Sequence, residues 1–298
     1  MGTKQIASLI LKILALTLIL VVCFAVGSSV AGLEPANQDL AEPSDSPLLA
    51  LAAVCLLNTL VLAYIILRSN WGGWKLIATV FAVFYGVTTV MGQIESAIFV
   101  TTLPPGTLPR LFLMGAIIAG LFSPLAVLML GKRRNESPVS ENGRLRMSIG
   151  SWIPRLLIIA IVYVVLYFSF GYFIAWRNPA LREYYGDTDS GSFIAQMEKV
   201  IADRPWLLPF QMMRAMMWTA LALPVIRMMK GEWWEAGLGV SLLFAVVMNS
   251  QLLLPNPYMP ESVRMSHLIE TATSNFIFGW VITWLVTRRS QQLMVEVS

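Results

Sequence analysis

The chain has 298 residues, of which 57% are hydrophobic and 13% charged, and its formal net charge is +4. Soluble domains contain about 45–50% apolar and about 25% charged residues, so the composition excludes an ordinary soluble domain and a disordered chain. Two cysteines and one histidine also exclude a disulfide scaffold and any zinc site that needs several histidines.

The apolar residues are gathered in blocks of about 20 residues, the length that an α-helix needs to cross the hydrocarbon core of a bilayer. We therefore predict an all-α, polytopic helical membrane protein, with about eight transmembrane helices in one bundle. Residues 1–298 form a single transmembrane domain in this prediction. The predicted spans, in chain order, are 10–31, 47–67, 76–100, 110–130, 156–176, 206–227, 233–254 and 263–287.

The first predicted span has features of a secretory signal sequence. Lys4 precedes the apolar run and Lys12 lies near its start. The segment 29–31 (SVA) before Gly32 is typical of a cleavage site. Cleavage would leave seven spans and an outer N-terminus. We expect an uncleaved first helix, because the later spans alternate in the same way in both cases.

Lysine and arginine are distributed unevenly between the predicted loops. With the N-terminus inside, most of the 21 basic residues fall on inner segments, whereas the first outer loop, 33–46, is acidic. The positive-inside rule then predicts a plasma membrane protein with both termini cytoplasmic. The sequon at 135–137 lies in an inner loop and should stay unmodified. The net positive charge follows from this asymmetry, so we expect membrane lipid as a partner and no nucleic acid; protein partners are unknown.

The longest outer segment, 177–205, follows the fifth span. Its second half places Phe193, Met197, Val200 and Ile201 at helical spacing on one face. This pattern predicts an amphipathic helix on the outer membrane surface, or a short helix packed over the end of the loop.

Ionisable and amide side chains within the spans stand at a similar depth in four different helices. At about 1.5 Å per residue, most lie roughly 8–12 Å from the outer boundary. Such residues are rare within membranes and usually face a bundle interior or a wet cavity. They are Gln93 and Glu95 on the third span, Arg214 on the sixth, Asn249 on the seventh, and His267, Glu270 and Asn275 on the eighth.

We interpret these residues as one polar cavity in the outer-leaflet half of the bundle. Glu95, His267 and Glu270 are the candidates for acid/base chemistry. The candidates for substrate binding are Arg214, Gln93, Asn249 and Asn275. A purely structural alternative remains, in which Arg214 pairs with Glu95 or Glu270 and fixes the packing of the helices.

A metal site is the weaker alternative. Glu95, His267 and Glu270 form a one-histidine, two-carboxylate set that is chemically reasonable for iron, manganese or zinc. Dinuclear helical-bundle sites use two Glu-x-x-His pairs, and this chain has no second histidine. No phosphate-binding, hydrolase, zinc-protease or dinucleotide motif is present, so the cofactor is unknown.

These observations favour a membrane protein that binds a small amphipathic or lipid-like substrate, or an anionic ligand. They leave transport and catalysis unresolved. One alternative is a membrane-embedded enzyme, using acid/base or single-metal chemistry on a lipid-linked substrate. Another is a structural or accessory subunit without chemistry. The inner half of the bundle has few polar residues, which argues against a continuous polar path for a transported solute.

Overall fold

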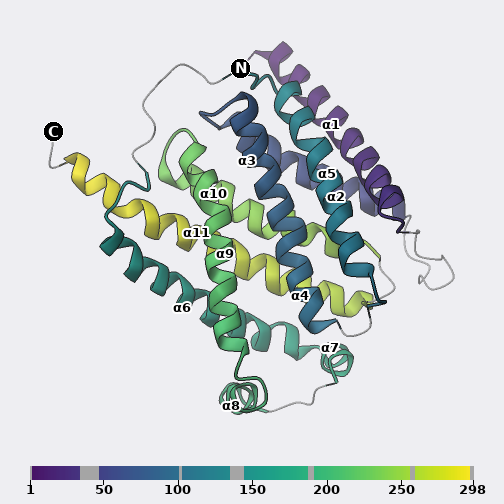
Figure 1. The fold of residues 1–298 in the computed structure, drawn as a ribbon, viewed down its shortest axis with the longest axis vertical. Coiled ribbons are helices and arrows are strands. Elements are labelled where there is room, and N and C mark those ends of the chain that lie inside the picture. The colour runs from purple at the N-terminus through teal and green to yellow at the C-terminus, as the bar shows by residue number, and fades with distance from the viewer. Residues whose placement is uncertain are drawn as a thin grey trace.

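The computed structural model describes residues 2–33, 47–100, 103–134, 144–186, 191–255 and 259–295, with side chains up to residue 288. Every regular element in these ranges is helical (Figure 1). The predicted all-α class is therefore confirmed. The acidic segment 34–46 and the sequon at 135–137 lie outside the described residues.

The long helices follow the predicted apolar blocks, and short π- and 3₁₀-helical segments interrupt or extend some of them. The α-helices are α1 (Thr3–Val30), α2 (Pro47–Leu67), α3 (Gly73–Tyr85), α4 (Met91–Phe99), α5 (Thr107–Met129), α6 (Ile149–Phe173), α7 (Pro179–Tyr184), α8 (Phe193–Asp203), α9 (Leu207–Met228), α10 (Trp233–Leu242) and α11 (Glu261–Val295). The π-helices are η2 (Gly86–Val90) and η4 (Leu243–Val247), and the 3₁₀ helices are η3 (Ala175–Arg177) and η5 (Ser250–Leu253).

Six helical stretches among the described residues are long and apolar enough to cross a membrane: Thr3–Val30, Pro47–Leu67, Gly73–Phe99, Thr107–Met129, Ile149–Arg177 and Trp233–Leu253. They match the first five predicted spans and the seventh. Helices α9 and α11 are also long, at 22 and 35 residues, but their polar residues, Arg214 and Glu270 among them, make them less apolar. The described ranges thus hold six candidate spans, which is compatible with a multi-pass helical membrane protein.

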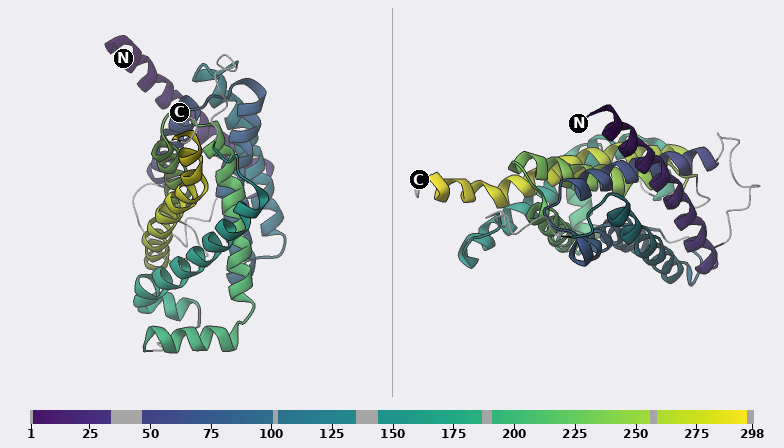
Figure 2. Two further views of the ribbon diagram at one scale, coloured as in Figure 1. Left: turned by 90° about the vertical axis from the view of Figure 1, so that its left-hand side faces the viewer. Right: turned by 90° about the horizontal axis from the view of Figure 1, so that it is seen from above.

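The long helices begin and end at two ends of the bundle. The terminal end holds both chain termini and the ends of α2, α5 and α9, and the distal end holds α7, α8, the ends of α1 and α4, and the start of α11 (Figure 1). In the side view of Figure 2, α8 lies across the long axis, at the opposite end from both termini. Its Phe193 packs on Tyr172 and Phe173, with ring centroids 5.3 and 5.6 Å apart.

Basic residues at the terminal end bind backbone carbonyl groups of neighbouring connections. Lys132 donates to the carbonyl oxygen of Ser69 over 2.9 Å, and Arg144 donates to that of Met229 over 3.0 Å. An antiparallel β-bridge joins Ser69 to Met229. Burial lowers the pKa of the Arg144 guanidinium, while the nearby Glu232 raises it. These bonds satisfy carbonyl groups that helix ends leave free, and they fasten the connections together.

The two π-helical segments lie in contact near the middle of the bundle. Carbonyl groups of the η4 segment accept hydrogen bonds from an amide side chain: the Asn249 amide donates to the oxygens of Phe244 and Ala245, each over 3.0 Å. Gly115 of α5 faces η2, where a Cβ atom would stand 2.0 Å from the Thr89 hydroxyl oxygen. Glycine therefore lets α5 approach η2 closely, and π-segments of this kind are frequent at functional sites.

Candidate functional site

Arg214 of α9 and Glu95 of α4 form a bidentate ion pair. Nη1 and Nη2 of Arg214 donate to Oε1 and Oε2 of Glu95 over 3.1 and 3.0 Å. The Arg214 side chain is only 3% exposed, whereas that of Glu95 is 32% exposed. An unpaired guanidinium at this burial would be very costly, so Glu95 is what allows Arg214 to stay charged inside the bundle.

The arginine has one further side-chain partner on its own helix. Its Nη1 also donates to Oε1 of Gln211, one turn earlier, over 3.1 Å. The Nε atom of Arg214 and the Nε2 atom of Gln211 are buried without a hydrogen-bond partner. Both terminal nitrogens of Arg214 thus donate to Glu95, while its Nε–H group has no partner.

His267 and Glu270 form a second pair, one turn apart on α11. The Nδ1 atom of His267 lies 3.0 Å from Oε2 of Glu270, and its Nε2 atom lies 3.0 Å from the hydroxyl oxygen of Tyr185. The imidazole therefore stands between a carboxylate and a phenol. With hydrogen on Nδ1, the neutral ring would donate a hydrogen bond to Glu270 and accept one from Tyr185, an arrangement suited to proton transfer along the three groups.

Tyr185 contacts His267, and no pattern in the sequence indicates this contact. It follows α7, which is fastened to α11 by Asn178: the Asn178 amide donates to the Ser262 carbonyl oxygen over 3.0 Å and to the Ser266 hydroxyl oxygen over 2.8 Å. The Tyr185 ring stacks on Trp176, with ring centroids 5.9 Å apart. Only the folding of 177–186 back onto α11 reveals its role.

The Tyr185 phenol is influenced by the carboxylates of both pairs. Burial raises the pKa of its phenol well above the ordinary value, and the charges of Glu95 and Glu270 raise it further. The hydroxyl group therefore stays protonated at neutral pH. Within the described residues no hydrogen bond joins Glu95 and Arg214 to His267 and Glu270, so the predicted four residues form two neighbouring pairs.

Asn249 and Asn275 lie beside these pairs and bind the backbone. The Asn275 amide donates to the carbonyl oxygen of Phe244 over 3.4 Å, adding to the bonds that Asn249 makes with the same π-segment. Oδ1 of Asn249 accepts a bond from the Thr271 hydroxyl over 2.6 Å. Both asparagines therefore hold the η4 segment against α11.

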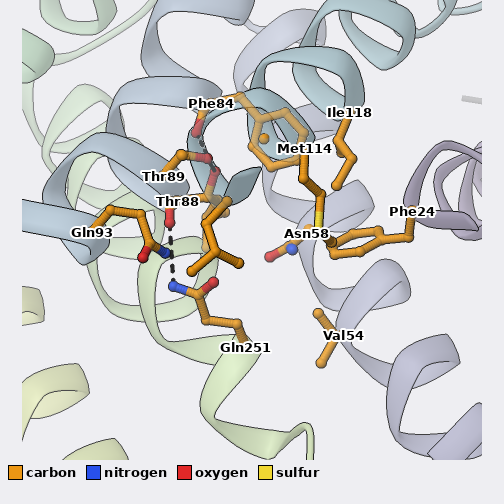
Figure 3. A pocket seen from close by; sticks show the side chains of 13 residues that line it. Phe24, Val54, Asn58, Phe84, Thr88, Thr89, Gln93, Met114, Ile118 and Gln251 are labelled. Atoms are coloured by element: carbon orange, nitrogen blue, oxygen red, sulfur yellow. Dashed lines mark hydrogen bonds between the residues drawn. The ribbon is translucent and has the colours of Figure 1, made fainter. Parts of the chain in front are cut away.

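A pocket of about 80 Å³ lies between α1, α2, α4, α5 and the two π-segments. Figure 3 shows Phe24, Val54 and Asn58 on one side of it, and Thr88, Gln93 and Gln251 on the other. The Gln251 amide donates to the carbonyl oxygen of Thr88 over 3.3 Å. The remaining lining residues are Phe84, Thr89, Leu111, Met114, Gly115, Ile118 and Val247.

Of the predicted binding residues, only Gln93 lines this pocket. Asn58, Thr88 and Gln251 were not predicted as a group, because no spacing pattern connects these three spans. Their one signal was polarity within an apolar helix. Which helices meet around the pocket, and on which faces, depends on packing that the sequence pattern does not encode.

The geometry does not support the metal alternative. In the parts of the chain that the structure describes, no group of three or more His, Cys, Asp or Glu side chains is close enough to hold a metal ion. Glu95 is bound to Arg214 and makes no contact with His267 or Glu270 among the interactions of the described residues.

Comparison of the chain with protein-family models, with curated proteins and with solved structures finds no match.

Proposed function

We propose that this chain is an eight-span plasma membrane protein that binds a small amphipathic or lipid-like ligand in the outward-facing half of its bundle. The observation that carries the proposal is the pocket between α1, α2, α4 and α5. Its walls combine apolar side chains such as Phe24, Val54 and Ile118 with amide and hydroxyl groups. Ligand pockets have this composition: apolar surface binds the body of the ligand, and a few polar groups orient it.

The depth of the pocket supports a ligand that enters from the membrane. Phe24 lies six residues before the end of α1, and Val54 and Met114 each lie seven residues after the start of α2 and α5. At 1.5 Å per residue, these positions are roughly 10 Å below the distal end of the bundle. A molecule bound there would keep its apolar part at the level of the acyl chains.

The two less apolar helices also run between the two ends of the bundle, which supports eight crossings. At the start of α9, Trp206 stacks with Phe99 at 6.3 Å, while Met229, after its end, bridges to Ser69. On α11, Arg264 donates to the carbonyl oxygen of Leu252, and the Leu285 carbonyl accepts a bond from Arg155 at the start of α6. Six or eight crossings both leave the two termini on one side, and the positive-inside rule makes that side cytoplasmic.

In this proposal the Glu95–Arg214 pair supports the pocket and does not itself bind the ligand. Glu95 stands two residues after Gln93 on α4, so the pair fixes α4 against α9 and sets the position of the Gln93 side chain. Helix α8, with Ile194 and Ile201 exposed, lies at the distal membrane surface as an interfacial helix.

Filling the pocket tests the proposal. We expect wild-type protein, extracted in polymer-bounded membrane discs, to retain a lipid class above its abundance in the surrounding membrane. Leu111→Trp places an indole at the pocket edge and should abolish that enrichment. Leu113→Trp is the matched control, since Leu113 is 48% exposed on the same helix. Equal lipid profiles for all three proteins, measured by mass spectrometry of the extracts, would argue against a ligand-binding pocket.

The Tyr185–His267–Glu270 chain favours one second candidate, a membrane-embedded acid/base enzyme. A carboxylate that orients an imidazole, which in turn contacts a hydroxyl group, is a common arrangement for proton transfer in catalysis. The same lipid extracts separate the two functions. An enzyme predicts a modified lipid that disappears in His267→Asn, whereas a binding protein predicts the same lipid in both proteins.

A further inference from the structure

We infer that the ligand of this pocket is an amphiphile with an uncharged, hydrogen-bond-donating head, such as the hydroxyl group of a diacylglycerol or a long-chain alcohol. The inference rests on the proposed function, because it assigns a chemical class to the ligand of the same pocket.

The lining of the pocket is polar but neutral. Five of its residues carry amide or hydroxyl groups, and none of the described lining residues is charged; the five are Asn58, Thr88, Thr89, Gln93 and Gln251. An ionised head group buried against this lining would lose its hydration without gaining a counter-charge, which is very costly in an apolar medium. A neutral head group has no such penalty.

The unsatisfied atom in the lining is an acceptor. Oε1 of Gln93 is buried and has no hydrogen-bond partner. Two other polar atoms of the lining have partners: Oδ1 of Asn58 accepts a bond from Ser250 over 2.9 Å, and Nε2 of Gln251 donates to the carbonyl oxygens of Thr88 and Met248. A ligand that satisfies Oε1 of Gln93 must donate a hydrogen bond. A hydroxyl or an N–H group can do so, whereas an ionised carboxylate cannot.

Nearby cations do not offer an anion site in the pocket. Arg214 directs both terminal nitrogens to Glu95. Arg110, next to Leu111 on α5, is exposed and donates to the carbonyl oxygen of Gly32 over 3.3 Å at the distal end. It stands at the rim, where it is solvated. The chemistry of the pocket therefore selects a neutral donor over an anion.

Two photoreactive probes with identical acyl chains test the inference: diacylglycerol and phosphatidic acid, each at low content in phosphatidylcholine nanodiscs that hold the full-length protein. We expect the diacylglycerol probe to label peptides from α2, α4 or α5, and labelling by phosphatidic acid to be much weaker. A long-chain alcohol probe should compete with the diacylglycerol. Gln93→Leu should lower diacylglycerol labelling about two- to tenfold, the effect of one hydrogen bond on affinity.

Control variants separate the possible outcomes. Gln5→Leu removes an amide at the terminal end, far from the pocket, and should leave labelling unchanged. Gln93→Arg adds a cation to the lining and should shift the preference toward phosphatidic acid. If phosphatidic acid labels the wild-type pocket better and Arg110→Gln removes this labelling, the neutral class is wrong, while the binding function stands. If neither probe nor the alcohol enters the pocket, the proposed function itself fails.

Discussion

Arg214 illustrates how one charged residue is stabilised within an apolar bundle. Its guanidinium is bound by Glu95 on a neighbouring helix and by Gln211 on its own helix, which together use both terminal nitrogens. Removing one partner of a buried pair is more destabilising than removing both, because the remaining charge is buried without compensation. The contribution of this pair to stability can therefore be separated from any role in ligand binding.

Glu95→Gln should lower the stability of the protein in detergent by about 3 kcal/mol, the lower end of the range for a broken buried pair, because Glu95 is partly exposed. Thermal unfolding followed by circular dichroism measures the effect. Combining Glu95→Gln with Arg214→Gln should recover part of the lost stability. The matched control is Glu198→Gln, which removes an exposed carboxylate from α8 and should change little.

The same variant distinguishes the functional interpretation of Glu95 from the structural one. If Glu95 only holds Arg214, lipid retention by the folded fraction should equal that of the wild-type protein. If Glu95→Gln leaves the unfolding temperature unchanged but abolishes lipid retention, the residue acts on the ligand directly, and the supporting role proposed above is wrong.

At the scale of the elements, the pocket depends on close approach between α5 and the π-segment η2. Gly115 makes this approach possible, since a Cβ atom there would lie 2.0 Å from the Thr89 hydroxyl oxygen and 2.7 Å from its methyl group. Gly120, further along the same helix, has its nearest neighbour, a ring carbon of Phe81, at 3.9 Å. Gly115 and Gly120 therefore lie on the same helix, but only Gly115 is in close contact with another segment.

Gly115→Ala should destabilise the protein by about 1–3 kcal/mol, the usual effect of overpacking, and should reduce lipid retention by displacing η2. Gly120→Ala should be neutral or slightly stabilising, because alanine favours a helix over glycine. Adding Thr89→Ala to Gly115→Ala removes the two nearest atoms and should restore part of the stability. Equal unfolding temperatures for the two single variants would show that α5 does not approach η2 this closely.

At the scale of the whole molecule, the helices alternate between two chemically different ends. The terminal end holds Lys132 and Arg144, which bind the carbonyl groups of neighbouring connections. The distal end holds α7, α8 and the tyrosine that contacts His267. Basic residues at the terminal end are consistent with a cytoplasmic location, and they also have a structural role there.

Glu198→Cys tests the orientation, since Glu198 is exposed on α8 at the distal end. We expect a membrane-impermeant thiol reagent to label this variant in intact cells. A fluorescent protein fused after Ser298 should fold and fluoresce inside. The native Cys23 and Cys55 are buried, so the wild-type protein is the unlabelled control. Labelling that requires permeabilised cells, together with a non-fluorescent fusion, would reverse the topology.

The sequence by itself determined the membrane class, the helical secondary structure and the approximate ends of the helices. These follow from the length and apolarity of each block, which are local properties that the bilayer imposes on any spanning segment. Counting residues along each helix also predicts a common depth for Glu95, Arg214, His267 and Glu270. The pairing of Glu95 with Arg214, and of His267 with Glu270, does not follow from the sequence.

Tertiary structure alone decided which side chains meet. Arg214 could have paired with either glutamate, and the choice of Glu95 depends on how α4 and α9 are rotated against each other. Tyr185 reaches His267 because α7 folds back onto α11, and Asn58, Gln93 and Gln251 share a pocket because α2, α4 and η5 converge there. Helix rotation and contact between distant segments depend on the packing of the whole bundle, whereas hydropathy reports one segment at a time.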